Sequence, residues 1–194
     1  MEKRIITIGR EYGSGGHEIG EKLSEILNKK LYDKKLLMEM AKKGKNYEEV
    51  KSFFQEKPVD SLLYAIAMNT LSGGMESKPF KEIKGIVEEE PGILIGCCGD
   101  YIFGGREDVL RVFIHADSSM RKVRIAQEEN INVEKAEKRI SQVDKERASF
   151  HKFYTQKEWD GLSNYDLVIS SSEFGIEGCI DIILHSLGKS DIAK

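Results

Sequence analysis

The sequence predicts an α/β fold in which a parallel sheet carries helices on both faces. Short, almost wholly apolar segments alternate along the chain with segments whose apolar residues recur at helical spacing. Strands that are apolar at nearly every position are typical of a parallel sheet covered on both faces, and strand–helix alternation is typical of α/β folds. No repeat, low-complexity tract or linker divides the 194 residues, so we expect a single domain over 1–194.

The first half of the chain begins with a strand and continues mainly as helices. Residues 4–9 are a strand candidate, and after a glycine-rich turn Ile19 and Leu23 share one face of a predicted helix. Residues 31–33 form a brief second strand candidate that ends in a carboxylate. No clear strand follows until residue 90, and in this region we expect four helices, at 34–43, 47–55, 59–71 and 80–89.

The second half of the chain alternates between strands and helices. Asp117 or Ser118 is placed to cap a helix, and Asn132 is placed to cap the next one. A last helix, which has Ile180 and Leu184 on its inner side, closes the chain. The strands expected in this half lie at 92–98, 109–115 and 166–169.

Composition and charge exclude several classes of protein. The chain has 30 Lys and Arg against 33 Asp and Glu, a net charge of −3, whereas proteins that coat nucleic acid or membranes are usually basic. Three cysteines without a CxxC pair argue against a disulfide framework or a zinc site. The sequence shows neither a signal-peptide pattern nor an apolar stretch near the ~20 residues of a membrane span. We therefore expect a soluble cytoplasmic protein with no nucleic-acid or membrane partner.

The most informative segment reads GREYGSGGH, at residues 9–17. It lies between a predicted buried strand and a helix start, where glycines let several N–H groups point at one place and the helix dipole adds positive charge. The segment therefore predicts an anion cradle, and the usual anion at such a turn is a phosphate. The alternative is a tight turn between strand and helix that binds nothing.

This segment matches the phosphate-binding P-loop motif, GxxxxGK[ST], only in part. Arg10 takes the position of the first glycine, Gly16 that of the lysine, and His17 that of the Ser/Thr. The lysine that grips the transferred phosphate is therefore missing, as is the hydroxyl that holds magnesium. His17 is placed to donate to a phosphate as an imperfect substitute. The four histidines match no metal-ligand spacing, so we expect no metal site built from them.

Six blocks that span most of the chain resemble the cytidylate kinase-like family of P-loop proteins. They are ITIGREYGSGGHEIGEKL (6–23), LYDKKLL (31–37), GCCGDYI (96–102), VLRVFIHAD (109–117), DKERASFHKFYT (144–155) and SNYDLVISSSEFGIEG (163–178). The resemblance implies a three-layer P-loop NTPase fold with a five-stranded parallel sheet, a helical substrate region at about 34–90 and a lid at about 132–164. One local departure is Cys97, where related sequences tend to have arginine.

The resemblance also implies an activity, with ATP and Mg²⁺ as cofactors. It points to an ATP-dependent phosphotransferase that acts on a small nucleotide, a nucleoside monophosphate such as cytidylate or deoxycytidylate. The main alternative is a non-catalytic nucleotide- or phosphate-binding protein with a degenerate P-loop. A third alternative is a structural or partner-binding protein that binds no nucleotide.

Phosphoryl transfer requires cations that neutralise the transferring group and carboxylates that orient metal or nucleophile. Asp33 is expected to position the acceptor, and Asp100 to hold magnesium through water or to accept a substrate proton. Arg147, in the basic lid region, is expected to stabilise the developing charge, and Arg124, on the preceding predicted helix, is expected to be a further catalytic residue. The expected nucleotide-binding residues are Arg10, Gly13, Ser14, Gly15, Gly16, His17, Arg139 and Asp144. The alternatives are that the two aspartates cap helices and that the basic residues form a solvated helix face.

Overall fold

A computed structural model of the chain describes residues 3–42 and 78–188. Five strands form one parallel sheet, with β1 at its centre and the order β2-β3-β1-β4-β5. Ile8 pairs with Ile95 on one side and with Val112 on the other. This architecture confirms the predicted fold class. The strands are β1 (Ile5–Arg10), β2 (Leu31–Tyr32), β3 (Ile93–Ile95), β4 (Val109–His115) and β5 (Leu167–Ser170).

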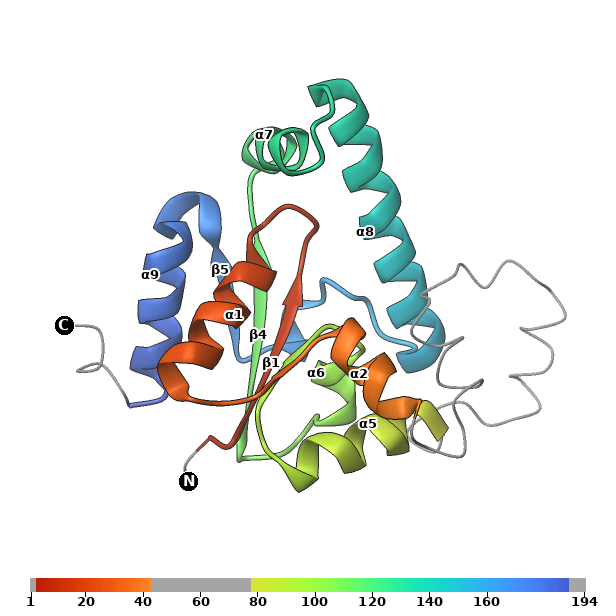
Figure 1. The fold of residues 1–194 in the computed structure, drawn as a ribbon, viewed down its shortest axis with the longest axis vertical. Helices are drawn as coiled ribbons and strands as arrows, with labels where there is room; N and C mark the ends of the chain where they lie inside the picture. The colour runs from red at the N-terminus through yellow and green to blue at the C-terminus, as the bar shows by residue number, and fades with distance from the viewer. Residues whose placement is uncertain (1–2, 43–77, 189–194) are drawn as a thin grey trace, which may run out of the picture.

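Helices cover both faces of the sheet and complete three layers (Figure 1). One face packs against α1 (Gly16–Leu27) and α9 (Ser171–Ser186), where Leu23 and Ile180 are buried against Ile6 and Ile8 of β1. The other face packs against α2 (Lys34–Ala41), α5 (Lys78–Glu89), α6 (Gly99–Ile102) and the end of α8 (Val133–Thr155). Both faces of the inner strands β1 and β3 are therefore buried, as their uninterrupted apolar pattern predicts, whereas Val168 of the edge strand β5 is exposed.

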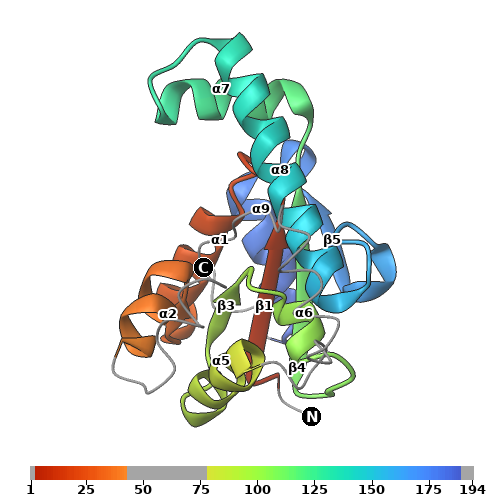
Figure 2. The ribbon, with the colours of Figure 1, turned by 90° about the vertical axis from the view of Figure 1, so that its right-hand side faces the viewer.

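Helix α7 (Ser118–Glu128) and the first half of α8 project beyond the carboxyl ends of the strands (Figure 2). Asn132 caps α8 by accepting the Lys135 N–H at 2.9 Å, as expected. The second half of α8 lies in the core, where Phe150 and Tyr154 are buried. The predicted lid region at 132–164 therefore contains a projecting part and an anchored part.

The third strand is shorter than expected. Residues 92–98 read as one apolar run, but β3 covers only Ile93–Ile95. Gly96, Cys97 and Cys98 have φ values of +70°, +54° and +56°. The Gly99 N–H donates to the Gly96 carbonyl at 3.0 Å and closes a left-handed turn that leads into α6. The helices expected at 34–43 and 80–89 correspond to α2 and α5, whereas those at 47–55 and 59–71 lie outside the described residues.

An ion pair joins β4 to the segment that enters β5, and it predicts a pH dependence of stability. Arg111 donates to both carboxylate oxygens of Asp166, at 2.6 and 3.1 Å. The Arg111 guanidinium holds the pKa of the Asp166 carboxyl below its ordinary value of 3.8. Because the unfolded state then binds the proton more readily, the stabilisation is complete above that value and is lost as pH falls through the folded pKa.

We therefore expect Asp166→Asn to lower the free energy of unfolding near neutral pH, and the difference from wild type to shrink below pH 4 (~3.8 being the unfolded pKa). Urea unfolding across this range measures the difference. Asp181→Asn, which removes an exposed carboxyl on α9, is the matched control. A difference between wild type and Asp166→Asn that is independent of pH contradicts the prediction.

Candidate functional site

The turn between β1 and α1 has the backbone geometry of an anion cradle. Gly13 and Gly15 both have φ of +79°, a left-handed conformation that glycine adopts without steric cost. The Ser14 hydroxyl donates to the Glu11 carbonyl at 2.8 Å and tightens the turn. Helix α1 begins at Gly16, and the first N–H groups of a helix have no partner within it. The start of α1 borders an open cavity, which Gly15, Gly16 and His17 line.

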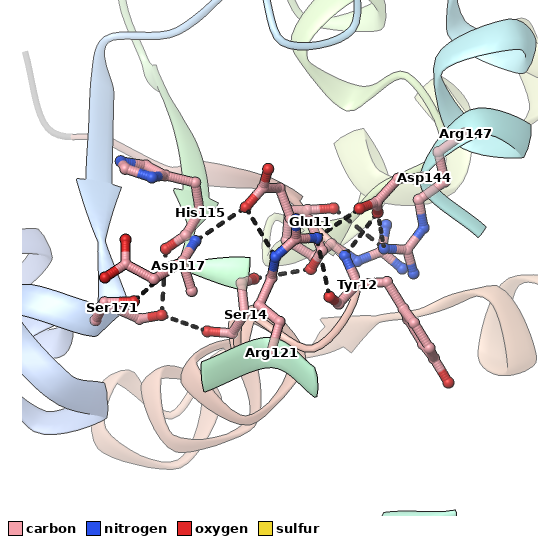
Figure 3. A network of polar contacts seen from close by, with 12 residues as sticks. Glu11, Tyr12, Ser14, His115, Asp117, Arg121, Asp144, Arg147 and Ser171 are labelled. Carbon is pink, nitrogen blue, oxygen red and sulfur yellow. Dashed lines mark hydrogen bonds and ion pairs between the residues drawn. The ribbon is translucent and has the colours of Figure 1, made fainter. Parts of the chain in front are cut away.

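Side chains of α7 and α8 bind the backbone of this turn (Figure 3). One oxygen of Asp144 accepts the Tyr12 N–H at 2.8 Å, and the other accepts from Arg121 at 2.6 Å. Arg121 also lies 3.5 Å from the Glu11 carboxylate. Arg147 donates to the Arg10 carbonyl at 3.1 Å. The two projecting helices therefore hold successive backbone groups of the glycine-rich turn.

The opposite side of the turn is fixed to the strand ends. The Glu11 carboxylate accepts the Ala116 N–H at 2.9 Å, just after β4. The Ser171 hydroxyl, at the start of α9, donates to the Ser14 carbonyl at 2.7 Å (Figure 3). The turn is thus held by β4, α9, α7 and α8 at once, and such preorganisation lowers the entropy cost of binding a phosphate.

An open cavity of about 480 Å³ lies over the glycine-rich turn. Arg124 contributes a cation to its wall and is paired with Glu18 at 3.1 Å. Of the predicted nucleotide-binding set, Ser14, Arg139 and Asp144 are not part of the wall. The predicted residues that line this cavity are Arg10, Gly13, Gly15, Gly16, His17, Arg124 and Arg147.

A second open cavity, of about 440 Å³, adjoins the first along Arg10 and His17. Asp33 lies in its wall and also caps α2, because its carboxylate accepts the Leu36 N–H at 2.7 Å. The function predicted for Asp33 and the capping alternative are therefore compatible. The cations in this wall, Arg10, Lys34, Lys35 and Lys42, outnumber the carboxylates, Asp33 and Glu39.

Asp100 lines neither open cavity. It lines a small cavity of about 30 Å³ that Arg10 also lines, and its carboxylate accepts from His151 Nε2 at 2.9 Å. Both side chains are almost fully buried, at 7% and 3% exposure. Tyr165 lines the same cavity; burial raises the pKa of its hydroxyl, which donates to the Trp159 carbonyl at 2.7 Å.

The buried Asp100–His151 pair predicts a large effect on stability. We expect His151→Leu to lower the free energy of unfolding by about 3–5 kcal/mol, because the Asp100 carboxylate would be left buried without its hydrogen-bond partner. His151→Gln keeps a donor close to the position of Nε2, so it is expected to lower the free energy of unfolding less than His151→Leu does. Urea unfolding at neutral pH measures both changes. A His151→Leu variant as stable as wild type would show that the pair contributes nothing.

Arg139 lies apart from both open cavities. Its side chain is 46% exposed, lies 3.6 Å from the Glu129 carboxylate, and stacks over the Tyr12 ring at 5.9 Å. Burial and the hydrogen bond to Glu129 raise the pKa of the Tyr12 hydroxyl, which therefore stays protonated as a donor. Arg139 thus contacts the glycine-rich turn at the Tyr12 side chain.

The residues present fit magnesium brought by a polyphosphate. No cluster of three or more metal-ligating side chains occurs within residues 3–42 and 78–188. Magnesium usually keeps several waters and takes one or two protein carboxylates together with substrate phosphates, so it needs no such cluster. The carboxylates that line the cavity over the glycine-rich turn, and are thus placed near its waters, are Glu11, Glu18, Glu21 and Glu128.

Sequence reasoning missed Arg121, Glu11 and His151 as site residues. Arg121 lies three residues before Arg124, which was the available signal, because residues at this spacing share a helix face. Glu11 stands inside the glycine-rich turn. His151 gave no signal, because its partner Asp100 is 51 residues away and comes from another element.

Comparisons with known proteins agree with this geometry. A family model described as the cytidylate kinase-like family matches residues 5–173. The chain belongs to this family. A cytidylate kinase of Archaeoglobus fulgidus is 30% identical over 94% of this chain and 93% of its own length. One of Methanopyrus kandleri is 25% identical over 92% of this chain and 90% of its own length.

Solved structures share the fold of this family member. An uncharacterized protein from Eubacterium ventriosum superposes with a TM-score of 0.74 at 28% identity, covering 96% of this chain and 99% of that one. Shikimate kinase from Bacteroides thetaiotaomicron superposes with a TM-score of 0.52 at 14% identity, covering 95% of this chain and 98% of that one, a likeness of fold alone. Among the described residues, no helix is both long and apolar enough to cross a membrane.

Proposed function

We propose that this cytidylate kinase-like protein transfers the γ-phosphoryl group of ATP to a nucleoside monophosphate, with cytidylate or deoxycytidylate as the preferred acceptor. The observation that carries the proposal is the pair of open cavities that meet at Arg10 and His17. Phosphoryl transfer needs donor and acceptor side by side and in line. The family and its cytidylate kinase relatives support a nucleotide kinase.

ATP is proposed to occupy the cavity over the glycine-rich turn. The backbone N–H groups of Gly13, Gly15, Gly16 and His17 bind its terminal phosphates, as a helix N-terminus binds anions. The Ser14 N–H already donates to the Glu11 carbonyl at 3.3 Å. Arg124 and Arg147 add positive charge from α7 and α8. Mg²⁺ supplies further charge neutralisation on the phosphates when bound. Asp144 acts indirectly, because it holds the Tyr12 N–H and so fixes the turn.

The acceptor is proposed to occupy the cavity lined by Asp33. Lys35 and Lys42 attract its phosphate, and the excess of cations in this wall favours an anionic ligand. The Asp33 carboxylate, held by the Leu36 N–H, is fixed in orientation and accepts a hydrogen bond from the acceptor nucleotide. We also propose that the enzyme acts in the cytoplasm on free nucleotides, which is consistent with its net charge of −3.

A non-catalytic nucleotide-binding protein remains the second candidate, favoured by one specific observation. Gly16 and His17 stand where an active P-loop has lysine and a hydroxyl residue. Such a protein keeps the cradle and binds ATP without turning it over.

Titration calorimetry with ATP, with each of the four ribonucleoside monophosphates and with deoxycytidylate, followed by an ADP-release assay, separates the candidates. Turnover with cytidylate or deoxycytidylate above the other acceptors is the expected result. ATP binding without turnover for any acceptor would favour the non-catalytic protein. Absence of ATP binding to the folded chain would refute both.

A further inference from the structure

Arg10 and Gly16 compete for the same space at the glycine-rich turn. Gly16 occupies the position of the P-loop lysine, and a Cβ atom there would lie 2.6 Å from Arg10 Cβ and 3.0 Å from Arg10 Cγ. Real Cβ atoms do not approach so closely, so the stem of Arg10 fills the space where a lysine side chain would begin. The arginine at position 10 therefore leaves no room for a lysine at position 16, and the two departures from the P-loop motif are linked.

The Arg10 side chain runs from this turn toward the end of β3. A Cβ atom on Gly96 would lie 2.3 Å from Arg10 Nη1 and 3.3 Å from its Cζ. The guanidinium thus lies against the bare backbone of Gly96, whose left-handed φ of +70° is part of the turn that follows β3. Two glycines, one at each end of the side chain, leave room for this path.

The Arg10 guanidinium differs from those of the neighbouring arginines in its partners. Arg121 lies 2.6 Å from Asp144, Arg124 lies 3.1 Å from Glu18, and Arg147 donates to the Arg10 carbonyl. Within the described residues, 3–42 and 78–188, the Arg10 guanidinium forms neither an ion pair nor a hydrogen bond with a protein group. A half-buried cation with five donors is stabilised when an anion binds it.

Arg10 also lies at the junction of the two open cavities, and it lines both of them. Its backbone is fixed by β1 and by the hydrogen bond from Arg147 to its carbonyl at 3.1 Å. An arginine fork binds two phosphate oxygens at once, which a lysine cannot do with the same geometry.

We propose that Arg10 replaces the P-loop lysine and bridges the transferred γ-phosphate and the acceptor phosphate. The inference rests on the proposed kinase function. An oxygen of the acceptor phosphate forms a bond to the γ-phosphorus while the bond from that phosphorus to the β,γ-bridging oxygen breaks. The products are ADP and a nucleoside diphosphate. The Arg10 guanidinium stabilises the charge on the equatorial oxygens.

The sharpest test moves the cation back to the P-loop position. Five proteins are compared: wild type, Arg10→Ala, Arg10→Gly, Gly16→Lys, and the double variant Arg10→Gly/Gly16→Lys. Position 10 is glycine in the double variant because the Cβ of alanine would still lie 2.6 Å from the lysine Cβ. We expect Arg10→Ala and Arg10→Gly to lower turnover by roughly 10²–10³-fold. Gly16→Lys alone is expected to lower turnover as well, because its side chain collides with Arg10. The double variant is expected to exceed both single variants at position 10 in turnover by roughly tenfold or more, since lysine then occupies the vacated space.

Arg4→Ala, at the exposed start of the same strand, is the matched control and is expected to behave as wild type. ATP affinity, measured by calorimetry, gives a readout that is independent of turnover, and Arg10→Ala is expected to weaken it by roughly tenfold. If wild type binds ATP without turnover, the kinase proposal fails, while weaker ATP binding by Arg10→Ala still supports the phosphate-binding role.

Two results overturn the inference. The first is an Arg10→Ala variant with the ATP affinity and the turnover of wild type. The second is a double variant no more active than Arg10→Gly although both fold, as judged by circular dichroism and urea unfolding. The first result would mean that Arg10 only packs between Gly16 and Gly96, and the second would mean that Arg10 does not replace the P-loop lysine.

Discussion

A Gly15→Val variant will bind ATP at least ~100-fold more weakly than wild type, because two or more charge-assisted hydrogen bonds from the turn are lost. Gly15 has φ of +79°, a conformation that a β-branched residue does not hold. A Cβ at this position would also lie 2.4 Å from Ile176 Cδ1 and 3.1 Å from Arg124 Nη1. Valine will therefore change the path of the turn and redirect the N–H groups that form the cradle. Titration calorimetry with ATP measures the loss.

Gly105→Val is the control for backbone strain in this experiment. Gly105 has φ of +75°, but a Cβ there meets nothing within 4 Å and it lines neither open cavity. Both variants are expected to lose a similar amount of stability from the left-handed φ, about 1–2 kcal/mol, and only Gly15→Val is expected to lose ATP affinity. Wild-type ATP affinity in folded Gly15→Val would show that the cradle is an ordinary turn.

The sheet could be predicted because its signal is local. Strands β1 and β4 are buried on both faces, so their residues are apolar nearly throughout, and Val109–His115 matched the expected strand residue for residue. The predicted end of the third strand, at residue 98, was wrong for an equally local reason. Cys97 and Cys98 have left-handed φ values, and nothing in an apolar Ile-Gly-Cys-Cys run signals such a conformation in residues other than glycine.

The candidate site could be predicted only in its contiguous part. The cradle comes from neighbouring residues, so its glycines and the helix start were visible together. The contacts that hold it are distant in sequence: Tyr12 and Asp144 are 132 residues apart, and Arg10 and Arg147 are 137 apart. Helical periodicity indicates that α8 has an inner face, but not which loop that face meets. The packing of the Arg10 side chain against Gly16 likewise depends on a side-chain path that sequence spacing does not reveal.

Arg147→Ala will lower turnover by roughly 10³-fold with a small effect on ATP affinity, as expected for an arginine that stabilises charge in the transition state. Arg147 is only 13% exposed and lines the cavity over the glycine-rich turn. It also lies over the Tyr12 ring, 5.4 Å from its centre, and donates to the Arg10 carbonyl. Its planar fork is thus oriented before any ligand arrives, and less rotamer entropy is lost when it binds a phosphate.

Lys152 is the matched control for Arg147 on the same helix. Its side chain is 50% exposed and pairs with Glu158 at the surface, so Lys152→Ala is expected to change turnover little.

Hydrogen exchange with and without ATP and acceptor should show closure in the projecting part, about residues 118–146. Residues 150–155 should not respond, because Phe150, His151 and Tyr154 are anchored in the core. Equal protection of 118–146 in both states, together with near-normal turnover of Arg147→Ala, would contradict closure. It would mean that α7 and the first half of α8 only stabilise the glycine-rich turn.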